Sequence, residues 1–139
     1  MASTTGTAAL PSTAALVARL IFAGVFAMAA IFKFFNMGGT ADYITAAGFP
    51  IGLVLAWAAA ILEVILVLCF LSGAYFSEAA IIAAVYVVFL GFAFHGPSHW
   101  SANQAEFGFF IDHFTFLAGL LFAACYGPGG FLALRRRLF

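Results

Sequence analysis

The chain contains few charged residues. Of its 139 residues, 7% are Asp, Glu, Lys or Arg and 66% are hydrophobic, whereas ordinary soluble domains have roughly 25% and 45–50%. A chain of this length could not bury so much apolar surface in one core, so the composition excludes a soluble globular domain and indicates an integral membrane protein. The formal net charge is zero, which leaves no electrostatic basis for binding nucleic acid.

Cysteine is also scarce. Cys69 and Cys125 are far apart, form no CxxC pair, and both fall late in apolar runs. This placement is typical of small buried hydrophobic residues. A membrane thiol oxidoreductase, which needs paired and accessible thiols, is therefore disfavoured.

Apolar sequence is abundant instead. Four runs, at 14–35, 50–71, 79–95 and 107–126, each approach the roughly 20 residues that a helix needs to cross a bilayer. We therefore predict an all-α fold, a four-transmembrane-helix bundle forming a single integral membrane domain over residues 1–139. The first 18 residues lack Lys and Arg, so the first run is expected to be a retained span after a short polar segment rather than a signal peptide. No run shows the interruption typical of transporter helices.

Lys and Arg in short loops predict the orientation of the helices. The arginines at 135–137 directly follow the fourth run, so the C-terminus is expected on the cytoplasmic side, and four spans place the N-terminus there too. The expected location is the cytoplasmic (inner) membrane of a bacterium or archaeon. The first and third connections then face outward.

Two groups of polar residues within the runs need partners, because an isolated charge in lipid costs at least about 2.5–3.5 kcal/mol. Counting depth from the centre of each run predicts an inner pair of Arg19 and Glu63, which either joins two helices or takes part in proton or ligand handling. On the outer half, Lys33 and Asp112 come within reach of each other if the first and fourth helices are neighbours. The predicted outer cluster consists of Lys33, His95, His99, Trp100, Glu106, Asp112 and His113.

The outer cluster leaves several ligands open. His95 and His113 at similar depth could hold a haem, but no second pair repeats the pattern, and the histidine spacing matches no metal motif; haem and metal are disfavoured. A quinone head needs hydrogen-bond donors beside an apolar entrance from lipid, which this cluster offers. The remaining alternative is a surface for a partner subunit. Asp112 and His113 are expected to face the bundle.

Five segments in order resemble the DoxX family of small membrane proteins. They are RLIFAGVFAMAAIFKF at 19–34, YITAAGFP at 43–50, LEVILVLCFLSG at 62–73, FIDHFTFLAGLL at 110–121 and YGPGG at 126–130. The resemblance carries over to Arg19, Lys33, Tyr43, Gly48, Pro50, Glu63 and Gly119. Asp112 departs from the pattern, since the family usually has lysine there.

The resemblance implies a four-helix bundle that often serves as an accessory subunit of membrane redox systems, with links to quinone-dependent thiosulfate oxidation, quinol oxidation and thiol stress. We therefore expect an accessory subunit that contacts other subunits, lipid and a quinone at the outer cluster, without covalently bound cofactor and without enzyme activity as an isolated chain. The alternatives are a quinone-reactive catalytic subunit and a structural or assembly protein with no ligand.

Overall fold

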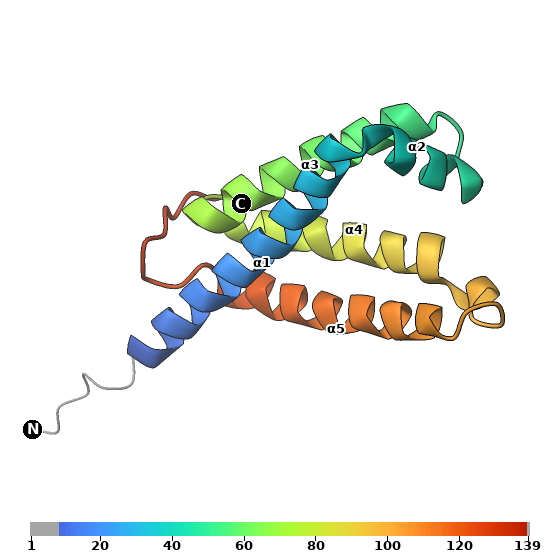
Figure 1. The fold of residues 1–139 in the computed structure, drawn as a ribbon. Coiled ribbons are helices and arrows are strands. Elements are labelled where there is room, and N and C mark those ends of the chain that lie inside the picture. The colour runs from blue at the N-terminus through green and yellow to red at the C-terminus, as the bar shows by residue number, and fades with distance from the viewer. Residues whose placement is uncertain (1–8, 139) are drawn as a thin grey trace, which may run out of the picture.

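The computed structural model describes residues 9–138 and places five α-helices and one 3-10 helix there (Figure 1). The elements are α1 (Ala9–Phe35), α2 (Met37–Ala46), α3 (Gly52–Ser72), α4 (Phe76–His95), η1 (Pro97–His99) and α5 (Ala105–Tyr126). Four of them, α1, α3, α4 and α5, are long and apolar enough to cross a membrane. The prediction of an all-α chain with four such helices is confirmed. The polar segment expected before the first span lies partly outside the described residues.

The first connection contains a helix that the sequence did not predict. α2 follows α1 after a break at Asn36, whose N–H donates to the carbonyls of both Phe32 and Lys33. Two glycines, a threonine and an aspartate made this segment read as a loop. It is helical because Ala41 and Ile44 are buried against α3. The first apolar run forms α1 without interruption, as predicted, and the break at Asn36 falls directly after it.

The break shifts α1 along its axis relative to α3. Gly52, the first residue of α3, lies so close to the carbonyl of Ala41 and the hydroxyl of Thr45 that a Cβ would overlap both. Lys33 precedes Ala41 by eight residues, and Glu63 follows Gly52 by eleven, which correspond to about 12 Å and about 16 Å of helix. The end of α1 thus reaches the middle of α3, not its end.

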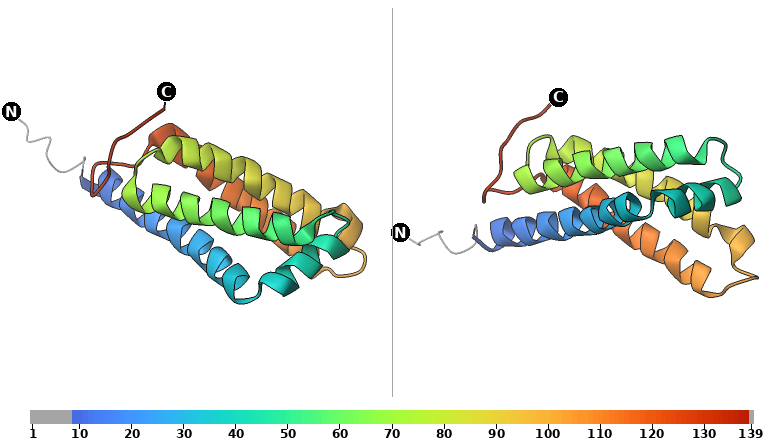
Figure 2. Two further views of the ribbon diagram at one scale, coloured as in Figure 1. Left: turned by 90° about the horizontal axis from the view of Figure 1, so that it is seen from above. Right: turned by 45° about the horizontal axis from the view of Figure 1, so that its top comes forward.

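The helices pack most extensively as two pairs, α1 with α3 and α4 with α5. α1 crosses obliquely in front of α4 and α5 (Figure 1), and Figure 2 shows α2 turning along α3 after the break. Phe22 and Phe26 of α1 pack against Phe70 of α3 and Phe116 of α5, with ring centroids 5.4–5.8 Å apart. These rings join the α1–α3 pair to the α4–α5 pair.

Arg19 lies at the end of the bundle where α3 finishes, and its side chain is buried. Its Nε donates to the carbonyl of Phe70 at 3.0 Å and its Nη2 to that of Leu71 at 2.6 Å. Its remaining donors bond to the carbonyls of Phe131 at 2.8 Å, Leu132 at 3.0 Å and Pro128 at 3.5 Å. The predicted Arg19–Glu63 pair is therefore wrong, because the last carbonyls of α3 supply the negative end of a helix dipole at this depth.

The segment after α5 folds back over the turn between α3 and α4. The N–H of Leu134 donates to the carbonyl of Ser72, and the N–H of Tyr75 to the carbonyl of Arg136, both at 2.8 Å. The N–H of Leu138 donates to Glu78 Oε1 at 2.6 Å. The C-terminal segment therefore lies at the same end of the bundle as the first turns of α1 (Figure 1).

Candidate functional site

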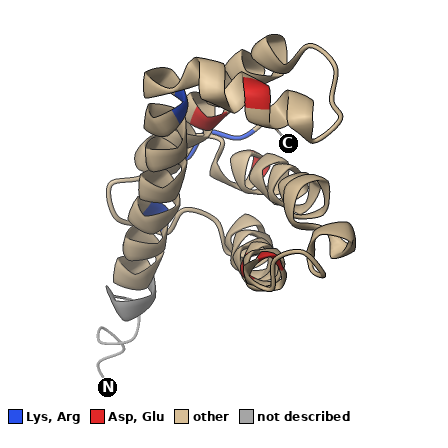
Figure 3. Cartoon of the chain, turned by 45° about the vertical axis from the view of Figure 1, so that its right-hand side comes forward, with Lys and Arg blue, Asp and Glu red and all other residues tan. Residues whose placement is uncertain are grey.

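Glu63 is the centre of a polar network in the middle of the bundle. Lys33 Nζ donates to Glu63 Oε1 at 2.7 Å and to Oε2 at 3.0 Å. The Tyr86 hydroxyl donates to Glu63 Oε1 at 2.9 Å. Because only 2% of the Glu63 side chain is exposed, the Lys33 ammonium group is the counter-ion that such a buried carboxylate requires. The Glu63 carboxylate thus links α1, α3 and α4. Figure 3 shows how few charged residues the chain carries.

A cavity of about 500 Å³ opens beside this network, between α2, α4 and the end of α1; we call it the lateral cavity. Its polar lining consists of Lys33, Asn36, Thr40, Tyr43, Tyr86, His95 and His113. Its apolar lining includes Phe32, Ile44, Leu90 and Phe94. The volume and the mixture of apolar walls with a few convergent polar groups are those of a small-molecule site.

An almost wholly apolar cavity of about 270 Å³ adjoins the lateral cavity and shares Ile44, Ala59, Tyr86, Leu90 and Phe94 with it. Its remaining walls come from α3, α4 and the segment between α2 and α3. The lateral cavity, with its few polar groups, thus lies against an apolar cavity across a shared wall. This arrangement suits an amphiphilic ligand, with its polar head near Lys33 and its apolar part along Phe94.

His95 and His113 come together in the lateral cavity, as the sequence predicted from their depth. Their ring centroids are 5.1 Å apart. His95 Nδ1 lies 2.5 Å from Glu106 Oε2, an ion pair or hydrogen bond between α4 and α5. His113 Nδ1 lies 2.7 Å from the carbonyl of Phe109. A carbonyl can only accept, so His113 Nδ1 carries a proton, and in the neutral ring Nε2 is left as an acceptor.

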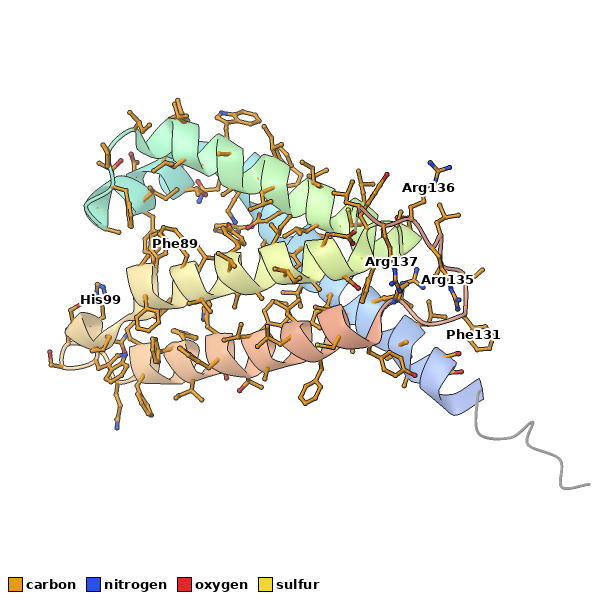
Figure 4. All side chains as sticks on the ribbon, turned by 180° about the vertical axis from the view of Figure 1, so that it is seen from behind. Phe89, His99, Phe131, Arg135, Arg136 and Arg137 are labelled. Carbon is orange, nitrogen blue, oxygen red and sulfur yellow. The ribbon has the colours of Figure 1, made fainter. Side chains whose placement is uncertain are left out.

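Four members of the predicted cluster lie outside this cavity: His99, Trp100, Glu106 and Asp112. Trp100 Nε1 donates to the carbonyl of His95 at 2.9 Å and so holds the end of α4. Glu106 reaches the cavity only through His95. His99, in η1, is exposed at the end opposite the arginines (Figure 4). His99, Trp100 and Glu106 shape the connection between α4 and α5.

Asp112 is placed differently from the prediction. It is exposed on α5 and does not face the bundle, and the expected Lys33–Asp112 contact is replaced by the Lys33–Glu63 pair. The reason is the axial shift of α1, which brings Lys33 level with Glu63. His113, the next residue, points about 100° further around the helix and packs against Gly91 of α4. Adjacent residues on a helix face different surroundings.

α5 is the least covered of the four long helices. In its most apolar stretch 6% of residues are buried, against 28% in α1, 28% in α3 and 39% in α4. Gly108, Asp112, Thr115 and Ala118 are exposed on it; we call the surface around them the α5 face. Small residues on a membrane helix allow a second helix to approach closely.

Tyr86 is the residue of the Glu63 network that the sequence reasoning missed. It was counted as part of an apolar run, although a tyrosine hydroxyl inside such a run needs a hydrogen-bond partner. This need for a hydrogen-bond partner could have identified Tyr86 from the sequence. Asn36 and Thr40 were missed for another reason, since their segment was assigned to a loop. Within residues 9–138, no group of three His, Cys, Asp or Glu side chains could hold a metal ion.

The four long apolar helices define a multi-pass membrane protein. The chain belongs to the DoxX family, whose model matches residues 14–96. The match includes Lys33, Glu63, Tyr86 and His95 but ends before α5, so the pattern around Asp112 lies beyond it. No curated protein and no solved structure matches the chain.

Proposed function

We propose that this protein is an accessory subunit of a membrane redox complex in a bacterial or archaeal cytoplasmic membrane, with both termini cytoplasmic. We further propose that its lateral cavity takes up the head group of a quinone. The redox setting rests on the DoxX resemblance. The subunit contact and the quinone are argued from two features of this chain, the α5 face and the lateral cavity.

The proposal of a partner subunit rests on the α5 face. Asp112 lies seven residues into α5, or about 10 Å from its first residue. An ionised side chain facing lipid costs at least about 2.5–3.5 kcal/mol. A neighbouring helix with a hydrogen-bond donor would remove this cost, and Gly108 and Thr115 beside Asp112 leave room for its backbone.

A photo-cross-linking residue in place of Asp112 tests this contact in native membranes. We expect a covalent product with a second, different polypeptide, whereas the same residue at the exposed Leu68 of α3 should label lipid. We also expect Asp112→Asn to reduce the recovery of that polypeptide with the tagged full chain. A tagged chain that purifies alone, with no cross-link from position 112 except to itself, contradicts the accessory role.

The proposal of a quinone rests on the lining of the lateral cavity. The Asn36 amide and the Tyr43 hydroxyl are donors on its lining, and the Lys33 ammonium group, paired with Glu63, and the His113 imidazole lie beside them. The adjoining apolar cavity would accommodate the start of an isoprenoid chain. These are the groups that a quinone needs at its carbonyl oxygens and its tail.

Quinone content tests this assignment. We expect quinone to be extracted from the purified wild-type protein, and its amount to fall strongly in Ala59→Phe, which fills the wall shared by the two cavities. Ile61→Phe adds the same ring to the exposed side of α3 and should leave the content unchanged. Equal quinone in the two variants, or none in the wild type, contradicts the assignment.

A second candidate function is a quinone-reactive catalytic subunit, which the proton-carrying groups around the cavity favour. Reduction of a quinone to a quinol takes up two electrons and two protons. The electrons would come from a redox centre of the partner, and the protons would pass through Lys33 and His113. In that case Lys33→Met lowers quinone turnover by the complex while quinone content is retained. An accessory role predicts unchanged turnover.

A further inference from the structure

The end of the bundle away from the lateral cavity has a polar cavity of its own, of about 300 Å³. It lies between the C-terminal segment, the first turn of α4 and the start of α1; we call it the arginine cavity. Arg135, Arg136 and Arg137 line it together with the hydroxyl-bearing Ser12 and Ser77. In Figure 4, Arg137 points back toward the helices and Arg136 points away from them. Three of the five basic residues of the whole chain meet here.

Hydrogen bonds to α1, α3 and the start of α4 hold the backbone of the arginine segment in place. The carbonyl of Arg136 accepts a hydrogen bond from the N–H of Tyr75, and the N–H of Leu134 donates to the carbonyl of Ser72. Arg19 adds bonds to the carbonyls of Phe131 and Leu132. The segment that carries the arginines is therefore held against α1, α3 and the start of α4 by hydrogen bonds to its backbone.

The electrostatics of the arginine cavity favour an anion. α4 begins at Phe76, and the N–H groups at the start of a helix attract negative charge. Among the described residues no acidic side chain lines the cavity. Glu78 is the acid at this end, and its Oε1 accepts from the N–H of Leu138. Guanidinium groups match the oxygens of a phosphate with two parallel hydrogen bonds, so phosphate is the preferred anion.

The position of the cavity indicates where the phosphate comes from. α3 ends at Ser72, α4 begins at Phe76 and α5 ends at Tyr126, so three spans reach the membrane surface beside the cavity. Leu132 and Leu134 are exposed on the same segment as the arginines. Basic residues among apolar ones at the end of a span are typical of contact with anionic lipid.

We propose that the arginine cavity binds a phosphate group, supplied by the head group of an anionic phospholipid. This site is separate from the lateral cavity, and its occupancy does not depend on a quinone or on a partner at the α5 face. The phosphate would lie between the Arg135 and Arg137 guanidinium groups and the start of α4. A bound lipid would then connect the C-terminal segment to the membrane surface.

Thermal unfolding of the purified full chain in detergent tests the site with three probes: phosphatidylglycerol, phosphatidylcholine and inorganic phosphate. Ligand that binds the folded state raises the midpoint of unfolding. We expect phosphatidylglycerol to do so at lower concentration than phosphatidylcholine. The double variant Arg135→Gln/Arg137→Gln should need about thirtyfold more phosphatidylglycerol for the same rise. Arg135→Lys/Arg137→Lys, which keeps the charge without the paired hydrogen bonds, should fall between.

The control variant has the same net charge as Arg135→Gln/Arg137→Gln, but its substitutions lie at the other end of the molecule. Ser101→Glu/Ala102→Glu changes two exposed residues near η1 and should respond to phosphatidylglycerol as the wild type does. If inorganic phosphate alone raises the midpoint through the two arginines, free phosphate is the source and the phosphate site stands. If the Gln variant responds to all three probes as the wild type does, or the control loses the response equally, the proposal is overturned.

Discussion

Glu63 shows how one buried residue can define the contacts of several helices. Its carboxylate accepts three hydrogen bonds, two from Lys33 of α1 and one from Tyr86 of α4. Removing one partner of a buried ion pair leaves a charge without compensation, which is more damaging than removing both. The contribution of the pair is therefore measured best when both members are changed.

We predict that Glu63→Gln lowers the free energy of unfolding by roughly 3 kcal/mol. Adding Lys33→Met to it should restore part of this loss, giving a coupling energy on the order of 2 kcal/mol in a double-mutant cycle. The measurement is denaturant unfolding of the purified chain in detergent. In the matched cycle with Arg19→Met, the two changes should add within about 0.5 kcal/mol. Strong coupling of Glu63 to Arg19 would mean that the observed partners are wrong.

Arg19 has a different role, because its hydrogen-bond partners are backbone carbonyls. We predict that Arg19→Met destabilises the protein by about 3 kcal/mol or more, since an unsatisfied buried polar group costs about 1–3 kcal/mol. Arg19→Lys should recover little, because one ammonium group cannot reach carbonyls on both α3 and the C-terminal segment. Leu20→Ala, at the exposed neighbouring position, is the control and should change the thermal midpoint much less.

At the scale of the elements, the break between α1 and α2 is the feature with the largest consequences. It allows a short helix to lie along α3, and it moves Lys33 to mid-depth. α2 stays there because Gly52 lets the backbone of α3 approach Ala41 and Thr45. The lateral cavity, which α2 lines with Thr40, Tyr43 and Ile44, depends on this contact.

We predict that Gly52→Ala destabilises the protein by about 1–3 kcal/mol, because the new methyl group overpacks the α2–α3 contact. Gly24→Ala is the matched control, since a Cβ there meets nothing within 4 Å. In a helix interior that change should stabilise by roughly 0.5–1 kcal/mol. Thermal unfolding of the two variants in the same detergent provides the comparison. Equal effects would show that α2 does not pack closely on α3.

The packing of α5 also explains why Asp112 and His113 have different surroundings. They are adjacent in sequence, but α5 contacts the bundle mainly through α4, so only one side of it is covered. His113 lies on that side, against Gly91, and Asp112 does not. The departure of Asp112 from the family pattern therefore concerns the outer surface of the helix, where a partner would bind.

At the scale of the whole molecule, the histidines and the arginine cluster lie at opposite ends of an apolar bundle, with the Glu63 network between them. The histidines and η1 lie at one end, and Arg135–Arg137 lie at the other (Figure 4). The start of α1 and the C-terminal segment share the arginine end (Figure 1). By the positive-inside rule this end is expected in the cytoplasm.

Reporter fusions test this orientation. We predict that a fluorescent protein fused after residue 139 is fluorescent and that alkaline phosphatase at the same point is inactive, because the latter requires export. Inserted at Ser101, in the connection between α4 and α5, the two reporters should give the opposite result. Active phosphatase at the C-terminus would reverse the proposed orientation, and with it the lipid leaflet that the arginine cavity faces.

Some of the structure followed from the sequence. Helices α1, α3, α4 and α5 were predicted within a few residues of their ends, because unbroken apolar runs of this length have few alternatives in a bilayer. The need for partners was also predictable, since charges such as Arg19 and Glu63 cannot remain isolated in lipid. The meeting of His95 and His113 followed from their similar depth.

The choice of partners was decided only by the tertiary structure. Counting depth assumes that each run is centred on the bilayer, and the break at Asn36 violates this assumption for α1. Lys33 therefore pairs with Glu63, and Arg19 caps the end of α3. The side of α5 that is covered depends likewise on how α4 packs, which periodicity cannot reveal in a helix that is apolar all round. The sequence by itself determined that this protein spans a membrane with paired charges inside, and the axial offset between its helices decided which charges meet.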